Sequence, residues 1–287
     1  MTDIDSTTDQ IIATIARSTS DIRQGFVGRR ETAGNENPSG EIQAKADVYA
    51  DELLAERLSA IDGVAQYASE ERTAVGNHGD GALSVAIDPL DGTSNLRSNN
   101  PLGTVFGIYD EPLPARGTAL VAAGYVIYGP ITTMVCARDD TVTEYEIIGG
   151  ERSVVTENST LPETPRVYGF GGRVPNWTDV FREFASEIET ELELHYSGAM
   201  INDVNQVLIH GGIFAYPALE DSPNGKLRLQ FEANPIGYIV ETAGGRSSDG
   251  TQSLLDVEPT DLHDRIPLHV GNTELIDRLE STLDAGE

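Results

Sequence analysis

The sequence predicts a layered α/β protein, and three of its features support this fold class. Short runs of β-branched and aromatic residues recur in the first half of the chain, which indicates the strands of a sheet. Apolar residues at helical spacing occur near both ends of the chain. A polar connector near residue 160 separates the strand-rich first half from a second half in which helices alternate with short strands.

The first predicted helix covers residues 7–26, where isoleucines recur at roughly helical spacing. Residues 34–40 are rich in Gly, Asn and Pro, which predicts a break and a mobile loop. Helical spacing resumes over residues 46–61. Residues 64–68 are then expected to form a strand that leads into a Ser-Glu-Glu sequence beginning at residue 69.

Further strands and helices follow from the same patterns. The expected strands are residues 83–87, 104–109, 120–128, 131–137 and 141–148. Beyond the polar connector at 153–165, the expected helices are residues 177–191, 199–209, 229–243 and 273–284. We therefore predict two halves, 1–160 and 161–287, joined in a single compact unit.

Acidic residues dominate the charge of the chain. In 287 residues, 47 Asp and Glu face 19 Lys and Arg, which gives a formal net charge of −28 spread along the whole sequence. At ~1 M salt the Debye length falls to about 3 Å, so distant charges no longer repel one another. We infer adaptation to a salt-rich cytoplasm, as in halophilic archaea, over the alternative of an ordinary acidic protein. Nucleic-acid binding is not expected, because no basic stripe is present.

The cysteine content and the N-terminus favour a cytoplasmic protein. Cys136 is the only cysteine, so no intrachain disulfide can form, and we expect a small buried apolar residue at this position. The N-terminal residues are acidic and polar, unlike a secretory signal or a transit peptide. No apolar stretch approaches the length that crosses a membrane, so no membrane association is expected.

The sequence LSVAIDPLDGTSN, residues 83–95, carries the strongest functional signal. An apolar strand is expected to end at Asp88, because Pro89 lacks a backbone donor and stops the ladder. Asp91 follows three residues on, and Gly92 permits a tight turn. Two carboxylates are therefore expected to project from one strand end.

Thr93, Ser94 and Asn95 come next and offer hydroxyl and backbone N–H groups to an anion. A carboxylate pair that holds metal, beside a turn that holds phosphate, suits the hydrolysis of a phosphate ester. The simple pattern of two aspartates and a glycine also fits a solvated turn, because Asp and Gly are common in turns.

The octapeptide DPLDGTSN, residues 88–95, is more specific. It resembles the DPLDGSSN or DPIDGTTN element of the metal-dependent, lithium-sensitive phosphatase superfamily, which contains the fructose-bisphosphatases and the inositol monophosphatases. In that superfamily a glutamate at a strand end supplies further metal ligands upstream, at about the distance of Glu70 and Glu71. Without this resemblance, a glutamate pair would be assigned to a solvated surface.

Within the superfamily the chain resembles the class I fructose-1,6-bisphosphatases. We find no WDxAAG-like element of the inositol monophosphatases. Residues 225–235, GKLRLQFEANP, are closely similar to the family's GKLRLLYECNP. Further matches occur in the family's order: HYSGAMINDVNQ (195–206), Tyr216-Pro217, ETAGG (241–245) and LHDRIPLHVG (262–271). The resemblance covers about four-fifths of the chain and implies a layered α-β-α-β-α sugar-phosphatase fold with two mixed sheets.

The resemblance implies a divalent metal site, with Mg²⁺ as the expected ion, Mn²⁺ as an alternative, and two or three ions per subunit. The implied ligands are Glu70, Glu71, Asp88, the backbone carbonyl of Leu90, Asp91 and Glu232. Like charges within ~4 Å repel by about 4 kcal/mol at an effective dielectric constant of 20. A cluster of these carboxylates is therefore tolerable only with cations among its members.

The resemblance also assigns roles around the reacting phosphate. Residues 92–94 are expected to cradle the 1-phosphate, and Asp91 is expected to take part in substrate binding and catalysis as well as metal binding. Asp47 and Glu71 are the expected acceptors of the proton from the attacking water. For Asp47 the alternative is an ordinary polar residue near a helix start, where Asp is favoured.

At the other end of the sugar, Tyr196, Tyr216 and Lys226 are expected to hold the 6-phosphate, and the backbone from Gly198 to Met200 to meet the sugar hydroxyls. The alternative for the tyrosines is packing in the core. The chain contains only two lysines, so one retained here indicates a task that suits a compact point charge.

Some family features are missing. The family's arginine that reaches the 6-phosphate of a neighbouring subunit is His195 here. YGFGGRVPNW, residues 168–177, occupies the approximate place of an NEGN or NEGY element, which suggests the hypothesis that Arg173 replaces a phosphate ligand. No clear match to the family's AMP site is found, so inhibition by AMP is not assumed. A homo-oligomer, dimer or tetramer, is expected from the resemblance.

The resemblance implies hydrolysis of the 1-phosphate of fructose 1,6-bisphosphate, a sugar bisphosphate, and two alternatives stay open. One is a broader phosphatase that acts on inositol phosphate, sedoheptulose bisphosphate or another sugar phosphate. The other is a non-catalytic acidic protein that binds metal or serves in interaction.

Overall fold

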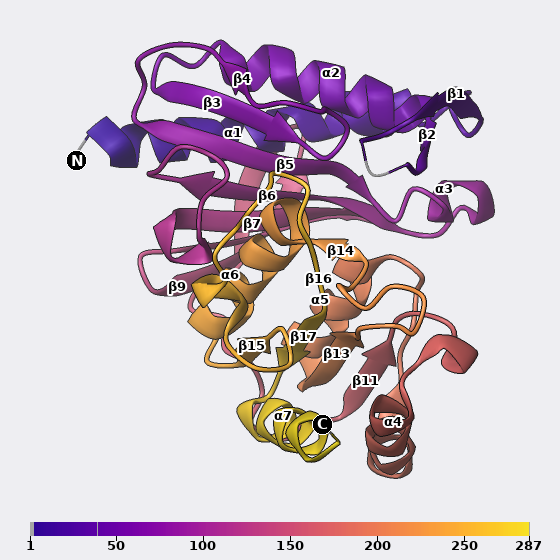
Figure 1. Cartoon of the computed structure of the whole chain (residues 1–287). Coiled ribbons are helices and arrows are strands. Elements are labelled where there is room, and N and C mark those ends of the chain that lie inside the picture. Colours follow the sequence, from indigo (N-terminus) through magenta and orange to yellow (C-terminus); the bar gives the residue numbers. More distant parts are fainter. Residues whose placement is uncertain (1–2, 39, 287) are drawn as a thin grey trace.

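The computed structural model describes residues 3–38 and 40–286, which form five alternating layers of helix and sheet (Figure 1). Two helices cover the outer face of a large sheet, two lie between this sheet and a smaller one, and two cover the outer face of the smaller sheet. In this order they are α1 (Asp3–Gly25), α2 (Lys45–Ser59), α5 (Met200–His210), α6 (Asn234–Thr242), α4 (Asp179–Glu191) and α7 (Thr273–Ala285). The predicted layered α/β class is confirmed.

The large sheet is mixed and has eight strands in the order β10-β9-β8-β7-β6-β5-β3-β4. Only the pairing of β3 with β5 is parallel, and the other neighbours are antiparallel. The strands are β3 (Val64–Ser69), β4 (Gly76–Asn77), β5 (Leu83–Asp91), β6 (Leu102–Tyr109), β7 (Leu120–Tyr128), β8 (Thr132–Arg138), β9 (Thr141–Ile148) and β10 (Glu151–Thr156).

The smaller sheet is also mixed and has five strands in the order β12-β11-β13-β17-β15. Its strands are β11 (Val167–Phe170), β12 (Glu193–Leu194), β13 (Gly212–Tyr216), β15 (Arg246–Ser248) and β17 (Leu268–Gly271). Two short ladders complete the strands: β1 (Thr32–Glu36) with β2 (Ile42–Ala44), and β14 (Leu227–Arg228) with β16 (Arg265–Ile266). The short helical segments are α3 (Asn95–Ser98), η1 (Gly117–Ala119), η2 (Val174–Asn176), η3 (Leu229–Ala233) and η4 (Leu254–Asp256).

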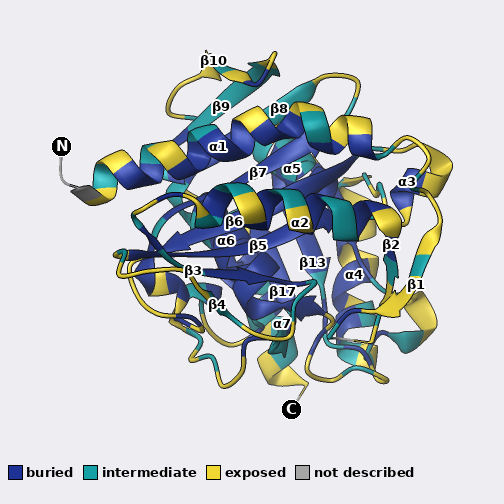
Figure 2. Ribbon diagram, turned by 90° about the horizontal axis from the view of Figure 1, so that it is seen from above, coloured by how far each residue is buried: buried dark blue, intermediate teal, exposed yellow. Residues whose placement is uncertain are grey.

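The central strands of the large sheet are buried on both faces, because α1 and α2 pack on one face and α5 and α6 on the other. All 9 residues of β5 are buried, which explains its nearly continuous apolar sequence. On α1, Ile11 and Ile15 are completely buried, and each such side chain stabilises the fold by about 1.5–3 kcal/mol. Figure 2 shows the strands as a buried layer beneath these two helices.

The segment predicted as a mobile loop, residues 34–40, overlaps a hairpin formed by β1 and β2, and Ser39 lies outside the described residues. The side chain of Asn37 closes it, because its Oδ1 accepts the N–H of Glu41 at 2.9 Å while the two backbones pair at 2.8 Å. Gly, Asn and Pro occur here in a tight turn between two short strands. The same residue types are common in irregular loops, so the sequence pattern does not distinguish the two.

The strand predicted to end at Asp88 continues to Asp91. The missing N–H of Pro89 interrupts the pairing with β6 and shifts its register, but pairing resumes between Asp91 and Gly103. The carbonyl of Pro89 is held by the hydroxyl of Thr104 at 2.8 Å. Pro89 therefore produces an irregularity within the strand rather than its end.

Two further predictions need correction. The first four residues of the polar connector predicted at 153–165 belong to the edge strand β10, whose exposed positions gave no clear alternation. The helix predicted at 229–243 is divided into η3, a π turn, and α6.

The predicted burial of Cys136 is confirmed, since 5% of this residue is exposed. None of the helices in the described part of the chain combines the length and apolar character needed to cross a membrane.

Candidate active site

A cleft of about 550 Å³ opens where the β1–β2 hairpin, the end of β5, the start of α5 and the segment β14–η3 meet. Both halves of the chain contribute to its lining. Fifteen of the site residues that the sequence predicted line this cleft: Asp47, Glu70, Glu71, Asp88, Leu90, Asp91, Gly92, Thr93, Ser94, Tyr196, Gly198, Met200, Tyr216, Lys226 and Glu232. Their individual roles are considered below.

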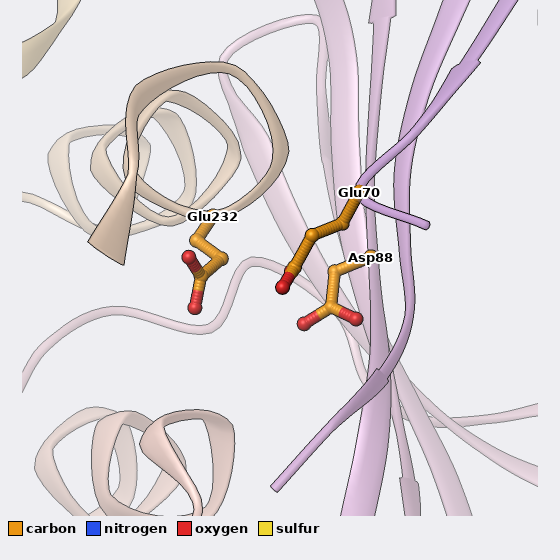
Figure 3. A group of neighbouring side chains, drawn as sticks. All are labelled: Glu70, Asp88 and Glu232. Atoms are coloured by element: carbon orange, nitrogen blue, oxygen red, sulfur yellow. The ribbon is translucent and has the colours of Figure 1, made fainter. Parts of the chain in front are cut away.

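Glu70, Asp88 and Glu232 converge on the floor of the cleft (Figure 3), where one carboxylate oxygen of each lies within 4.8 Å of the others. Glu70 directly follows β3, and Asp88 lies in β5, the parallel neighbour of β3. The N–H of Glu70 donates a hydrogen bond to the carbonyl of Ile87 at 3.1 Å. Glu232 approaches from η3. The three residues are 3–6% exposed. Converging carboxylate oxygens fit a hard divalent cation.

The electrostatics of the floor also favour a cation. Burial raises the pKa of Glu70 and Asp88 well above the ordinary value, and the neighbouring carboxylates raise it further. Burial raises the pKa of Glu232 to about 7, against the opposing effect of Arg228. Each group is thus harder to ionise in the metal-free chain, and a bound divalent cation would reverse this effect.

Arg228 supplies part of the missing positive charge. Its guanidinium lies 3.1 Å from Glu70, 3.2 Å from Glu41 of the hairpin and 3.9 Å from Glu232, and its side chain is 4% exposed. Its backbone N–H also binds Glu232 Oε2 at 2.6 Å. Arg228 therefore orients two of the floor carboxylates and links them to the hairpin.

Asp91 and Glu71 line the cleft but do not belong to the group of three carboxylates. Asp91 Oδ2 accepts the N–H of Ile201 in the first turn of α5 at 2.8 Å, and burial raises its pKa to about 6. Glu71 Oε2 accepts the amide of Gln43 at 2.5 Å, and burial raises its pKa to about 8. Each carboxylate is thus tied to an element outside the floor.

The turn after β5 is tightly packed. Gly92 has φ 78°, and a Cβ at this position would lie 2.2 Å from the side chain of Ala199, so only glycine fits. Thr93 Oγ1 lies 2.8 Å from the carbonyl of Leu90 and 2.5 Å from Asp47. Asp47 also accepts the N–H of Ala44 at 2.6 Å, so this residue caps α2 and lines the cleft at once.

The rim of the cleft is more open. Tyr196 is 53% exposed, Tyr216 is half-buried and Lys226 is exposed. His195 is not among the lining residues; its Nδ1 lies 3.0 Å from Gln206, beside an adjoining hollow. Arg173 is exposed and also outside the lining, so its role as a phosphate ligand stays a prediction.

Sequence reasoning missed twelve residues that line the cleft, among them Arg30, Gln43, Arg97 and Arg228. Arg228 could have been predicted from the sequence. It follows Lys226 by two residues in a predicted motif, and in a strand this spacing places both side chains on one side. Arg97 lies one helical turn beyond the turn at residues 92–94. For Arg30 and Gln43 no motif was available, because Arg30 precedes the β1–β2 hairpin, Gln43 lies in it, and the hairpin matched no motif.

The layered fold, the buried carboxylates and the adjacent turn together define a metal-dependent sugar-phosphatase class. Residues 9–151 match the family model for the fructose-1-6-bisphosphatase N-terminal domain, and residues 161–284 match the model for the C-terminal domain. The chain belongs to the fructose-1,6-bisphosphatase family and is a phosphatase, and the family implies dependence on a divalent metal.

Relatives and solved structures agree with this assignment. A class 1 fructose-1,6-bisphosphatase of Natronomonas pharaonis is 60% identical over 277 residues, which cover 96% of this chain and 98% of that protein. One of Haloarcula marismortui is 54% identical over 283 residues, covering 99% and 97%. The crystal structure of Leishmania major fructose-1,6-bisphosphatase in holo form is 27% identical, with a TM-score of 0.91 over 97% of this chain and 94% of that one.

Proposed function

We propose that this chain hydrolyses the 1-phosphate of fructose 1,6-bisphosphate to fructose 6-phosphate and inorganic phosphate, a reaction of gluconeogenesis. The observation that carries the proposal is one cleft lined by two chemically different sets of side chains. Buried carboxylates and the turn at residues 92–94 form one set, and Lys226 with two tyrosines forms the other. A sugar with a phosphate at each end matches this arrangement. Inositol phosphate, with a single phosphate, would leave Lys226 without a partner.

We further propose that two or three Mg²⁺ ions bind at the floor, with Mn²⁺ as an alternative. The residues that would hold them are Glu70, Glu71, Asp88, Asp91, Glu232 and the carbonyl of Leu90. Such an ion supplies Lewis-acid chemistry, which favours ionisation of water and offsets the negative charge of the reacting phosphate. The raised pKa values of the metal-free carboxylates support this assignment.

The proton of the attacking water would pass to Glu71, with Asp47 beside it. Gln43 occupies Oε2 of Glu71, which leaves the other carboxylate oxygen to accept the proton. The hydroxyl and N–H groups of residues 92–94 would hold the 1-phosphate. Asp91 joins β5 to the start of α5 and would thereby align the backbone near Met200 with the sugar hydroxyls.

Under this proposal the half 1–160 supplies the metal and phosphate chemistry and the half 161–287 the sugar binding, except that Glu232 of the second half completes the metal site. We also propose a cytoplasmic homo-oligomer, dimer or tetramer, working at high salt. A net charge of −28 and a free buried cysteine support a reducing, salt-rich compartment.

Phosphate release measured in molar KCl tests the function. The assay compares fructose 1,6-bisphosphate with sedoheptulose 1,7-bisphosphate and inositol 1-phosphate, each with Mg²⁺ and with EDTA. We expect the highest kcat/KM for fructose 1,6-bisphosphate and complete loss in EDTA. A higher kcat/KM for inositol 1-phosphate, or equal release in EDTA, would contradict the proposal.

A further inference from the structure

Two buried aspartates lie one turn apart on α2, and only one of them reaches the cleft. Asp47 and Asp51 are 4% and 6% exposed, and their spacing of four residues places them on one face of the helix. Asp47 lines the cleft beside Thr93. Asp51 does not line it, and the proposed reaction gives it no role.

Asp51 is held by two partners behind the site. Its Oδ2 accepts the Nε–H of Arg72 at 2.7 Å, and its Oδ1 accepts the hydroxyl of Tyr67 at 3.1 Å. Tyr67 is 1% exposed, and the guanidinium of Arg72 lies over its ring at 5.6 Å from the centroid. Burying an unpaired carboxylate would cost free energy, so the charged partner and the hydroxyl are needed to keep Asp51 in this position.

Arg72 closes the turn that carries the two predicted metal-binding glutamates. Its N–H binds the carbonyl of Ser69 at 3.0 Å, and the Ser69 hydroxyl accepts the N–H of Glu71 at 3.2 Å. The carbonyl of Arg72 accepts Nε2–H of His263, from the second half of the chain, at 2.9 Å. Arg72 is therefore fixed at its side chain by α2 and at its backbone by the loop around His263.

We propose that Asp51 is a positioning residue for metal binding: through Arg72 it holds the turn at Glu70 and Glu71 in place. The same helix face holds the phosphate-binding turn through Asp47 and Thr93. One rigid helix therefore sets the distance between the metal ligands on one side and the phosphate on the other. The inference rests on the proposed function, because that function makes Glu70 and Glu71 metal ligands.

Asp51→Asn tests this role, because it keeps the shape and the bond from Tyr67 but removes the charge that pairs with Arg72. We expect the Mg²⁺ concentration for half-maximal activity to rise about tenfold, the effect usual for residues that orient metal ligands. The KM for fructose 1,6-bisphosphate at saturating Mg²⁺ should change less than twofold.

Glu280→Gln is the matched control. Glu280 accepts bonds from Arg246 at 2.6 Å and Ser248 at 2.5 Å, its side chain is 16% exposed, and it does not line the cleft. It should lower the unfolding temperature and leave the Mg²⁺ dependence unchanged. If Asp51→Asn behaves in the same way, its role is structural only and the proposal is wrong.

A second variant and a direct measurement complete the test. Arg72→Lys keeps a cation at a side chain that is 41% exposed, so it should fold and raise the half-saturating Mg²⁺ by a smaller factor. Calorimetric titration of the full chain with Mn²⁺, without substrate, separates the two proposals. Metal binding that weakens in Asp51→Asn supports the positioning role even if fructose 1,6-bisphosphate is not hydrolysed. Unchanged Mn²⁺ affinity in both variants overturns it.

Discussion

The floor and the rim of the cleft differ in how far the fold has already fixed them. On the floor, Glu70 and Glu232 are buried and paired with Arg228 before any ligand arrives. On the rim, Lys226 and Arg97 are exposed, and neither side chain has a hydrogen bond or ion pair with the described residues. A fixed floor suits chemistry that tolerates little displacement, whereas an open rim suits binding of a charged ligand. Substitutions should therefore affect kcat on the floor and KM on the rim.

The largest effect is expected on the floor. Glu232→Gln keeps the bond to the N–H of Arg228 but removes a charge from the three-carboxylate group. We expect kcat to fall about 10³-fold, equivalent to about 4 kcal/mol, with a smaller change in KM. Steady-state kinetics across a Mg²⁺ series check this. A variant that keeps more than a tenth of the wild-type kcat would place Glu232 outside the reaction.

Without metal, the free energy of unfolding should depend on pH, because the buried carboxylates of the cleft are hard to ionise. Burial raises the pKa of Glu71 from 4.5 to about 8 and that of Glu232 from 4.5 to about 7. Between these values the folded chain binds more protons than the unfolded chain, so the free energy of unfolding falls as the pH rises. In EDTA we expect a loss of the order of a few kcal/mol between about pH 5 and pH 8.

Thermal unfolding at fixed KCl measures this loss, and saturating Mg²⁺ should flatten the profile. An EDTA profile that rises over the same pH range would mean that the carboxylates stay ionised without a cation.

On the rim, Lys226→Gln should raise the KM for fructose 1,6-bisphosphate about 30-fold, because one charge-assisted contact contributes about 2 kcal/mol. The value of kcat should change less. Fructose 1-phosphate, which lacks the 6-phosphate, is the matched control, and its KM should be the same for the variant and the wild type. Equal losses for both sugars would show that Lys226 does not contact the 6-phosphate.

The smallest effect is expected at Arg97, an exposed cation at the edge of the cleft. At molar salt, charges separated by more than about 3 Å are screened, so Arg97 contributes only when it touches the ligand. Arg97→Gln should raise KM about threefold. Arg166→Gln, an exposed arginine outside the cleft lining, should leave KM unchanged. If both variants raise KM equally, the effect comes from net charge rather than contact.

The sequence was sufficient for the floor because its residues stand in recognisable motifs. Glu70 directly follows β3 and Asp88 lies in β5, the parallel neighbour of β3, so their proximity is a direct consequence of the topology. The layered fold and most of the strands could be predicted in the same way, from apolar runs that are buried on both faces.

The hydrogen bonds and ion pairs between the site residues could not be predicted from the sequence, because they join segments that are distant in the chain. Arg228 meets Glu41 across the cleft, and Gln43 meets Glu71 from a hairpin that composition presented as a loop. Asp51 looked like any polar helix residue until its burial against Tyr67 was known. A sequence pattern predicts whether a side chain lies on the buried or the exposed face of its helix or strand. It does not predict which distant segment packs against that side chain.

The π turn that carries Glu232 makes the site sensitive to the number of residues between β14 and α6. Residues Leu229–Ala233 form a wider turn directly before α6, with one residue more than an ordinary helical turn needs. Deleting a single residue there would let α6 extend backwards as a regular helix. Each position before the deletion would then rotate by about 100° around the helix axis. If the deleted residue is Ala233, Glu232 would turn away from Asp88 although its own side chain is unchanged, so a deletion there is expected to break up the three-carboxylate group.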